Sequence, residues 1–255
     1  SIGRNAFNQC ISLTSITIPD GVTSIEDNAF YGCTSLSSIT IPSSVTSIGI
    51  NAFAYCQSLT YIPIPDGVTS IGNNAFYSCR SLASLSFPDS VTSIGEDAFF
   101  ETELTFMEDT NSIKYLISNS GNTAYLIDGS SASGNVTLPN TLGLASVALI
   151  GDGAFIVCTN ITSITIPDSV TSIGRSTFEQ CINLTGITIP DSVISIGSDA
   201  FRDCSSLISI TIPESVTLIG AQTFDGCSSL TNITIPESVT LIGNGAFNNC
   251  LDLTS

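Results

Sequence analysis

A phrase of 23 residues recurs along the chain, and no other feature limits the possible folds so strongly. Its most regular member is a phenylalanine that returns every 23 residues in two series. The first series is Phe7, Phe30, Phe53, Phe76 and Phe99, and the second is Phe155, Phe178, Phe201, Phe224 and Phe247. A unit of this size cannot bury its own apolar face, so successive units must stack and share one core. The repeat therefore predicts a solenoid.

Each unit carries the local signals of short extended segments. In "LSSITIP" the apolar Ile39 and Ile41 alternate with polar residues, which is the period of a half-buried strand. Pro42 then ends the strand because it has no N–H to donate. Asn28 is expected to cap a single helical turn that contains the core phenylalanine. The expected fold class is α/β, a right-handed solenoid with parallel strands on one face and short helical turns on the other.

The phrases "LTSITIPDSV", "SVTSIG" and "NAFYGC" resemble the BspA-like leucine-rich repeats, a 23-residue class. The resemblance implies a single leucine-rich repeat solenoid over residues 1–255, with repeats at 1–102 and 142–255. Residues 103–141 depart from the phrase and are expected to form an irregular insertion that contains a hairpin. Members of this family occur in surface and secreted proteins and are associated with adhesion.

The charge balance limits the partners of the chain. It has 22 carboxylates against 5 basic residues, for a formal net charge of −17. Such a field repels nucleic acid and anionic lipid head groups, and it favours basic partners or cations. The longest apolar run, at 142–150, is too short to span a bilayer. We therefore expect no nucleic acid partner and no membrane insertion of this segment.

Nine cysteines raise the question of disulfides or metal. Each stands three residues after a core phenylalanine, and only Thr102 breaks the series. Equivalent residues in neighbouring turns could come close enough for a disulfide. The stronger interpretation is a column of reduced, buried thiols, since cysteine there behaves as a small hydrophobe. Without a histidine or a CxxC pair, no metal site and no cofactor are expected.

Two polar columns follow the predicted strands, with carboxylates directly after the prolines and hydroxyls pointing out from the strands. The candidate binding residues are Asp168, Asp191, Glu214 and Glu237, with Thr165, Thr188, Thr211 and Thr234. These columns form either a solvated edge that prevents aggregation or a recognition surface. Stacked carboxylates repel each other and gain when a cation or basic partner lies against them. Catalysis needs one carboxylate pair whose environment differs from the rest, so no enzyme is expected.

The insertion offers further candidates. Its segments "IKYLI" and "AYLI" are predicted to be hairpin strands around the turn-rich "SNSGN". Inserted loops in solenoids often line the binding face, although a packed spacer is equally open here. Tyr115, Tyr125 and Lys114 are the residues that we expect to be exposed.

The resemblance and the acidic columns together predict an extracellular or cell-surface module that binds a protein or adheres through a solenoid face. The expected partner is a host matrix protein, another cell-surface protein or a glycan, either basic or bridged by cations. A structural surface component that self-assembles is the alternative. The chain begins in mid-phrase at "SIGRNAF" and is interpreted as a monomeric piece of a longer protein.

Overall fold

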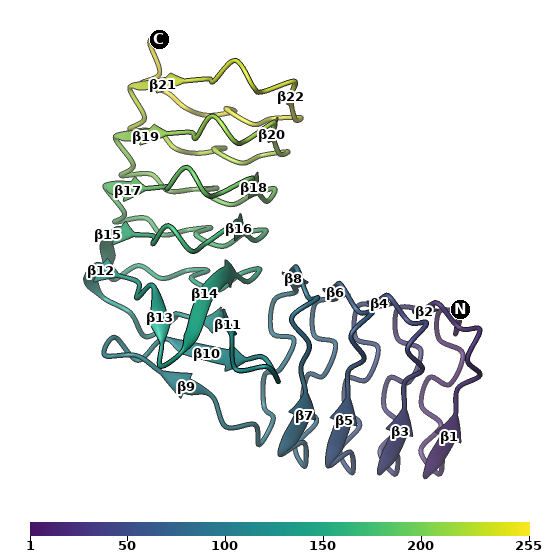
Figure 1. Cartoon of the computed structure of the whole chain (residues 1–255). Helices are drawn as coiled ribbons and strands as arrows, with labels where there is room; N and C mark the ends of the chain where they lie inside the picture. Colours follow the sequence, from purple (N-terminus) through teal and green to yellow (C-terminus); the bar gives the residue numbers. More distant parts are fainter. The chain divides into compact units, whose positions relative to one another are not determined.

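The computed structural model describes all 255 residues, and it consists of strands and turns without a helix. No helix of membrane-spanning length is therefore present. The chain divides into two compact units, Ser1–Phe106 with Ile117–Asn122, and Met107–Leu116 with Thr123–Ser255. Within each unit the chain winds in stacked coils (Figure 1). The parallel-strand solenoid is confirmed for each unit, whereas one solenoid through residues 1–255 stays a prediction.

The first unit stacks three-residue strands on one side of its coils and two-residue strands on another. The three-residue strands are β1 (Ser15–Thr17), β3 (Ser38–Thr40), β5 (Tyr61–Pro63) and β7 (Ser84–Ser86). The two-residue strands are β2 (Ser24–Ile25), β4 (Ser47–Ile48), β6 (Ser70–Ile71) and β8 (Ser93–Ile94). Pairing is parallel and in register with the repeat, so that Ile16 faces Ile39 and Ser24 faces Ser47.

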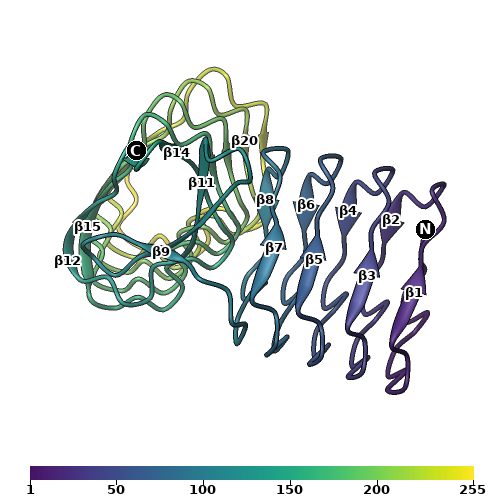
Figure 2. The same cartoon turned by 60° about the horizontal axis from the view of Figure 1, so that its bottom comes forward.

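The second unit begins with irregular strands and continues with the same regular coils. The irregular strands are β9 (Met107–Glu108), β10 (Lys114–Ile117), β11 (Thr123–Asp128), β12 (Gly134–Thr137), β13 (Thr141–Leu142) and β14 (Ala145–Ile150). The longer regular strands are β15 (Ile161–Thr165), β17 (Gly186–Thr188), β19 (Ser209–Thr211) and β21 (Asn232–Thr234). The shorter ones are β16 (Ser172–Ile173), β18 (Ser195–Ile196), β20 (Leu218–Ile219) and β22 (Leu241–Ile242). In Figure 2 these coils lie nearly behind one another.

The third side of each coil consists of tight turns where the sequence predicted a helical turn, and that prediction was wrong. Asn28, the expected helix cap, has a φ of 56°, and Gly32 has a φ of 69°, both in the left-handed region. The same two positions of the repeat have a positive φ in every turn. The N–H of Phe30 donates to the carbonyl of Ala52 in the next coil, at 2.8 Å. A helix would use such N–H groups within its own segment, so hydrogen bonds between coils replace the helical turns.

The core of each unit is a stack of equivalent side chains. Neighbouring phenylalanine rings of the repeat lie 5.1 to 5.5 Å apart between centroids, with interplanar angles of at most 13°. Ile25, Val45 and Leu36 are likewise buried at their own repeat positions. Close stacking also explains a glycine position, since a Cβ on Gly197 would lie 2.5 Å from the nitrogen of Arg175 in the preceding coil.

Strands of the segment 103–141 join the sheets of the second unit. Strands β10 and β11 are hydrogen-bonded neighbours within it. Strand β12 lies within the range 103–141 and pairs in parallel with β15, so that Thr137 faces Thr165. The hairpin tip belongs to the first unit, where the backbone N–H of Asn119 donates to the carbonyl of Phe87 at 2.7 Å.

Candidate functional site

The outward face of the sheet β12-β15-β17-β19-β21 carries the predicted hydroxyl column. Because side chains alternate along a strand, Ile164 and Ile210 point into the core and are buried, while their neighbours Thr165 and Thr211 are exposed. Register places Thr165 opposite Thr188. Thr211 faces Thr234 in the same way, and all four threonines are exposed. Their exposure is confirmed, whereas their role in binding stays a prediction.

The acidic column lies just beyond the strand ends. Each carboxylate follows a buried proline, and Asp168, Asp191, Glu214 and Glu237 are all exposed. The serine after each acid ties the turn to the preceding coil, as when the Ser192 hydroxyl donates to the carbonyl of Val170 at 2.7 Å. The backbone that carries the acids is thus fixed by hydrogen bonds, which limits the ordering cost of binding at this position.

The four acids have no basic counterpart within their own unit. Its basic side chains pair elsewhere, Lys114 with Asp128 at 2.8 Å and Arg175 with Asp199 at 3.4 Å. Arg202 lies among four other carboxylates, none of which belongs to the acidic column. The column is therefore an uncompensated negative stripe beside small neutral hydroxyls, and such a stripe attracts cationic groups.

The structure corrects the expectation for the insertion. Tyr115 and Tyr125 were expected to be exposed, but only 0% and 1% of their surfaces are accessible. Consecutive residues are buried along both strands, so each tyrosine lies in a strand covered on both faces. The Tyr115 hydroxyl donates to Asp109 at 3.2 Å. Burial, with the nearby Asp109 carboxylate, raises the pKa of Tyr115. Neither tyrosine is available to a partner, and Lys114 is already engaged in its ion pair with Asp128.

Sequence reasoning missed Thr137 as a member of the hydroxyl column. It lies on β12, faces Thr165 and is exposed like the other threonines. Its signal was present in "VTLPN", which matches "ITIPD" at residues 164–168. The column therefore begins inside the segment that had been set apart as an insertion.

The nine cysteines occupy one position of the repeat, and all nine are free in the structure. Seven of them are buried, as the interpretation of a core column predicts. Cys10 is exposed and Cys250 is half-buried. The structure gathers no group of three or more potential metal ligands. Burial raises the pKa of Cys79 and of Cys181 to about 12, so these thiols stay protonated at neutral pH.

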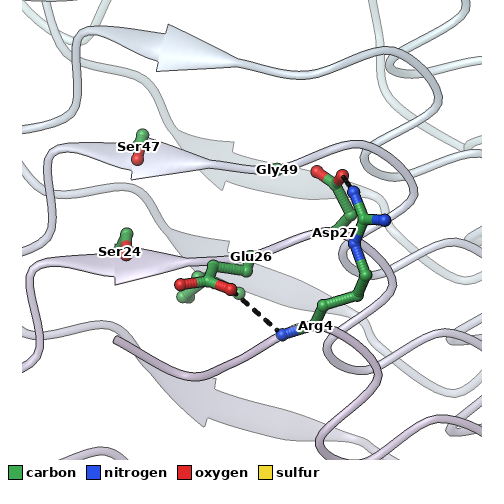
Figure 3. A pocket seen from close by; sticks show the side chains of 7 residues that line it. Arg4, Ser24, Glu26, Asp27, Ser47 and Gly49 are labelled. Carbon is green, nitrogen blue, oxygen red and sulfur yellow. Dashed lines mark hydrogen bonds and ion pairs between the residues drawn. The ribbon is translucent and has the colours of Figure 1, made fainter.

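A shallow hollow in the first unit lies beside β2 and β4, where Glu26 replaces the glycine of other turns (Figure 3). Its carboxylates join successive coils. Asp27 pairs with Arg4 and accepts the N–H of Ile50 at 2.9 Å, and Glu26 accepts the N–H of Arg4 at 3.2 Å. These contacts give the two acids structural roles between successive coils.

Stacked parallel strands that present exposed polar columns define a leucine-rich repeat scaffold. The chain belongs to the BspA type leucine-rich repeat family, whose model matches residues 1–123 and 135–255 in six copies. A search of curated proteins finds no match. Leucine-rich repeat proteins commonly use this scaffold to bind other proteins.

Several solved structures are similar to the chain. A leucine-rich repeat protein from Bacteroides ovatus is 30% identical, with 99% of this chain and 80% of that chain covered and a TM-score of 0.43. A leucine-rich cell surface protein from Faecalibacterium prausnitzii is also 30% identical, with 90% and 81% covered and a TM-score of 0.43. The pneumococcal vaccine antigen PcpA is 20% identical, with 92% and 66% covered and a TM-score of 0.48.

Proposed function

We propose that this chain is an extracellular or cell-surface adhesion module that binds a basic protein surface through the hydroxyl and acidic columns of its second unit. The observation that carries the proposal is the unpaired row Asp168, Asp191, Glu214 and Glu237 beside exposed threonines. A row of like charges on a fixed backbone costs repulsion in the free protein, and a cationic partner relieves it.

The hydroxyl column gives the partner a flat polar surface. Side chains on the outward face of β15, β17, β19 and β21 are serine, threonine, glycine and asparagine, which are short and carry donors and acceptors. Such a surface suits hydrogen bonding to a protein, while the acids add charge selection and faster encounter. The equivalent environments of the four acids argue against a catalytic role, because general acid and general base need different environments.

The surface location is supported by family membership and by the similar protein from Faecalibacterium prausnitzii, which is described as a cell surface protein. Adhesion is proposed on the same grounds. A glycan partner and a cation-bridged contact are alternatives that the same binding screen distinguishes. We propose that the chain acts as a monomer, in contrast to self-assembly, which light scattering would detect as growth with concentration.

The test is a binding screen of the chain against extracellular matrix proteins, glycans and poly-L-lysine. The test variant replaces Asp168 and Asp191 by Asn, and Glu214 and Glu237 by Gln. The control variant removes the same number of exposed carboxylates elsewhere, with Asp20→Asn, Asp66→Asn, Glu108→Gln and Asp252→Asn. Each variant removes four negative charges, so the two have the same net charge.

The proposal predicts that the test variant loses most of its affinity for the captured partner, while the control variant keeps it. Equal affinity of the two variants would overturn the assignment of this face. Loss of binding on addition of a chelator would instead identify a cation-bridged contact. If the chain bound only glycans in the screen, the partner would be a glycan and not a protein.

A further inference from the structure

A row of four aromatic side chains crosses the turn side of the first unit. It consists of Tyr31, Tyr55, Tyr77 and Phe100, hereafter the aromatic row. Successive ring centroids lie 5.3, 5.6 and 5.4 Å apart. None of the four is buried, and Phe100 is 51% exposed. Aromatic rings that are in contact with one another and at least partly exposed form an apolar surface that typically marks an interaction site.

The repeat itself does not require these rings. Tyr31, Tyr77 and Phe100 directly follow a core phenylalanine. The same position in the second unit carries Glu179 and Arg202, whose side chains lie 3.7 Å apart in an ion pair. Both kinds of residue are compatible with the same backbone, so the aromatic row is a property of the first unit and not of the fold.

Tyr55 reaches the row from a different position. The residue after Phe53 is the buried Ala54, and Tyr55 comes one place later, where the backbone is left-handed with a φ of 62°. Gly32 and Gly226 occupy this position in other coils. Val157 and Gln180 have a positive φ at this position as well, so the left-handed backbone belongs to the repeat and Tyr55 uses it to reach the row.

The ring orientations leave Tyr55 without a flat-stacked neighbour. Its plane lies at 65° to that of Tyr31 and at 58° to that of Tyr77, whereas Tyr77 and Phe100 are nearly parallel at 20°. The rings of the row are therefore tilted relative to one another, so that a partner can contact ring faces as well as ring edges. A planar cation can lie against such rings, and guanidinium does so more readily than ammonium.

Two carboxylates and one guanidinium act on the Tyr77 ring. Partial desolvation raises the pKa of the Tyr77 phenol, with further contributions from Tyr55, Glu101 and Asp97 and an opposing one from Arg80. The chain itself already places a guanidinium here. Arg80 donates to Glu101 at 2.8 Å and to the Ser78 hydroxyl at 3.2 Å. An arginine side chain is thus already held by a carboxylate and a hydroxyl beside the last coil of the row.

We propose that the aromatic row is a second binding surface, which takes an arginine-bearing segment of a partner protein, with guanidinium groups against the rings and near the flanking carboxylates. This surface is independent of the acidic column in the second unit. It differs from that column in the chemistry it selects, because a row of carboxylates alone accepts lysine and arginine alike, whereas aromatic rings favour arginine.

The experiment uses fluorescence anisotropy to measure the binding of fluorescently labelled probes to the full chain. The probes are an arginine-glycine repeat peptide, the same peptide with lysine for arginine, a neutral glutamine version and a β-linked glucose oligosaccharide. Test variants are Tyr55→Gly, which copies Gly32, and Tyr77→Asn, which copies Asn8 and Asn248 at the equivalent position. The control is Tyr61→Ser, which removes an exposed tyrosine from β5 where β1, β3 and β7 carry serine.

The arginine peptide should bind at least about tenfold more tightly than the lysine peptide. Each test variant should weaken that binding by about tenfold, while Tyr61→Ser and the acidic-column variant leave it unchanged. Equal binding of the two cationic peptides, or preferential binding of the oligosaccharide, would overturn the proposal. So would a melting temperature of Tyr55→Gly as low as that of the core truncation Phe53→Ala, since the ring would then be structural.

Discussion

The thiol of Cys204 donates a hydrogen bond to the backbone carbonyl of Phe178 in the preceding coil, with a sulfur to oxygen distance of 3.0 Å. That carbonyl also accepts the N–H of Cys181 at 3.1 Å. The same contact recurs along the solenoid, at 3.0 Å between Cys79 and Phe53. A buried carbonyl has two lone pairs that can each accept a hydrogen bond. The cysteine at this position fills a small apolar volume, and its thiol is also a weak second donor to that carbonyl.

This arrangement predicts how the thiols react. A thiol reagent added to the native protein without reductant should label Cys10 first and Cys250 more slowly, because the other seven are buried. After denaturation all nine should react, and mass spectrometry of labelled peptides identifies each site. Protection of Cys10 in the native state, or fewer than nine labels in the unfolded chain, would contradict the structure.

The buried thiols also predict a loss of stability at alkaline pH. Burial raises the pKa of Cys79 and Cys181 to about 12, against roughly 8.5 in an unfolded chain. Above about pH 8.5 the unfolded chain releases these protons and the folded chain keeps them, so unfolding becomes more favourable up to about pH 12. Each such thiol should lower the free energy of unfolding by about 1.4 kcal/mol per pH unit in that window.

Urea denaturation in the presence of reductant, between about pH 7 and pH 11, measures that slope. The double variant Cys79→Ala, Cys181→Ala should lose stability less steeply than the wild type. The control Cys10→Ala removes an exposed thiol and should leave the slope as it is. An identical slope in the wild type and the double variant would show that these two thiols do not govern the alkaline loss.

Close stacking of the coils predicts unequal effects of two glycine substitutions in the second unit. Gly197→Ala would place a Cβ 2.5 Å from the nitrogen and 2.6 Å from the Cα of Arg175, both backbone atoms. We expect a loss of about 1–3 kcal/mol in the free energy of unfolding. Gly186→Ala meets no atom within 4 Å and serves as the control. It should be neutral or stabilising by up to about 1 kcal/mol, because alanine reduces the freedom of the unfolded chain. Equal losses at both sites would show that the coils can move apart at Gly197.

Periodicity predicted the stacked coils and the exposed columns because each repeat position has one environment throughout the stack. The alternation of Ile164 with Thr165 fixes which side chains enter the core, and it recurs in every regular coil. The same rule places Thr137 in its column, because "VTLPN" matches "ITIPD" at residues 164–168. Periodic residues were thus predictable from the sequence.

The wrong predictions concern two kinds of position. At one kind the backbone conformation determines the structure, and the other kind lies in a segment that occurs only once in the chain. Asn28 is favourable both as a helix cap and in the left-handed region, so residue type alone did not distinguish the two, and hydrogen bonding between coils selected the left-handed turn. Tyr115 and Tyr125 lie in strands without a repeat that would reveal which face is inward. The aromatic row is visible in "AFYG" and "AFFE", but its continuity depends on the left-handed backbone of Tyr55.

Pro63 predicts a site where the first unit can be stabilised. Strands β3 and β5 lie side by side in Figure 1, yet β1-β3 and β5-β7 form separate sheets. Pro63 lies on β5 and has no N–H to donate to a neighbouring coil. Pro63→Thr should restore one ladder hydrogen bond and raise the free energy of unfolding by about 0.5–1.5 kcal/mol.

The control for that substitution is Pro65→Thr, at the strand end, where the repeat places proline in most coils. It should give no gain, because proline there restricts the unfolded chain without removing a strand bond. Thermal unfolding followed by circular dichroism compares both variants with the wild type. A lower melting temperature for Pro63→Thr would identify Pro63 as a required feature of this coil.

The unpaired acidic column predicts that salt stabilises the protein at pH 7. Repulsion among Asp168, Asp191, Glu214 and Glu237 exists only where the fold holds them in adjacent coils, and added salt screens it. Raising sodium chloride from about 0.01 M to about 0.15 M should therefore increase the free energy of unfolding. The variant with all four acids replaced by Asn or Gln should be more stable at low salt, by about 0.2–1 kcal/mol for each neighbouring pair removed. It should also respond less to salt.

Ser43 provides the converse test in the first unit, because it interrupts the equivalent acidic series between Asp20 and Asp66. Ser43→Asp fills the gap and should destabilise the protein at low salt, with recovery as salt is added. Asp20→Asn removes an acid whose neighbour in the next coil is Ser43, so it should change stability little. If Ser43→Asp had no salt-dependent effect, neighbouring coils would hold their carboxylates too far apart to repel. The unpaired column would then be a solvated edge with no stored repulsion for a basic partner to relieve.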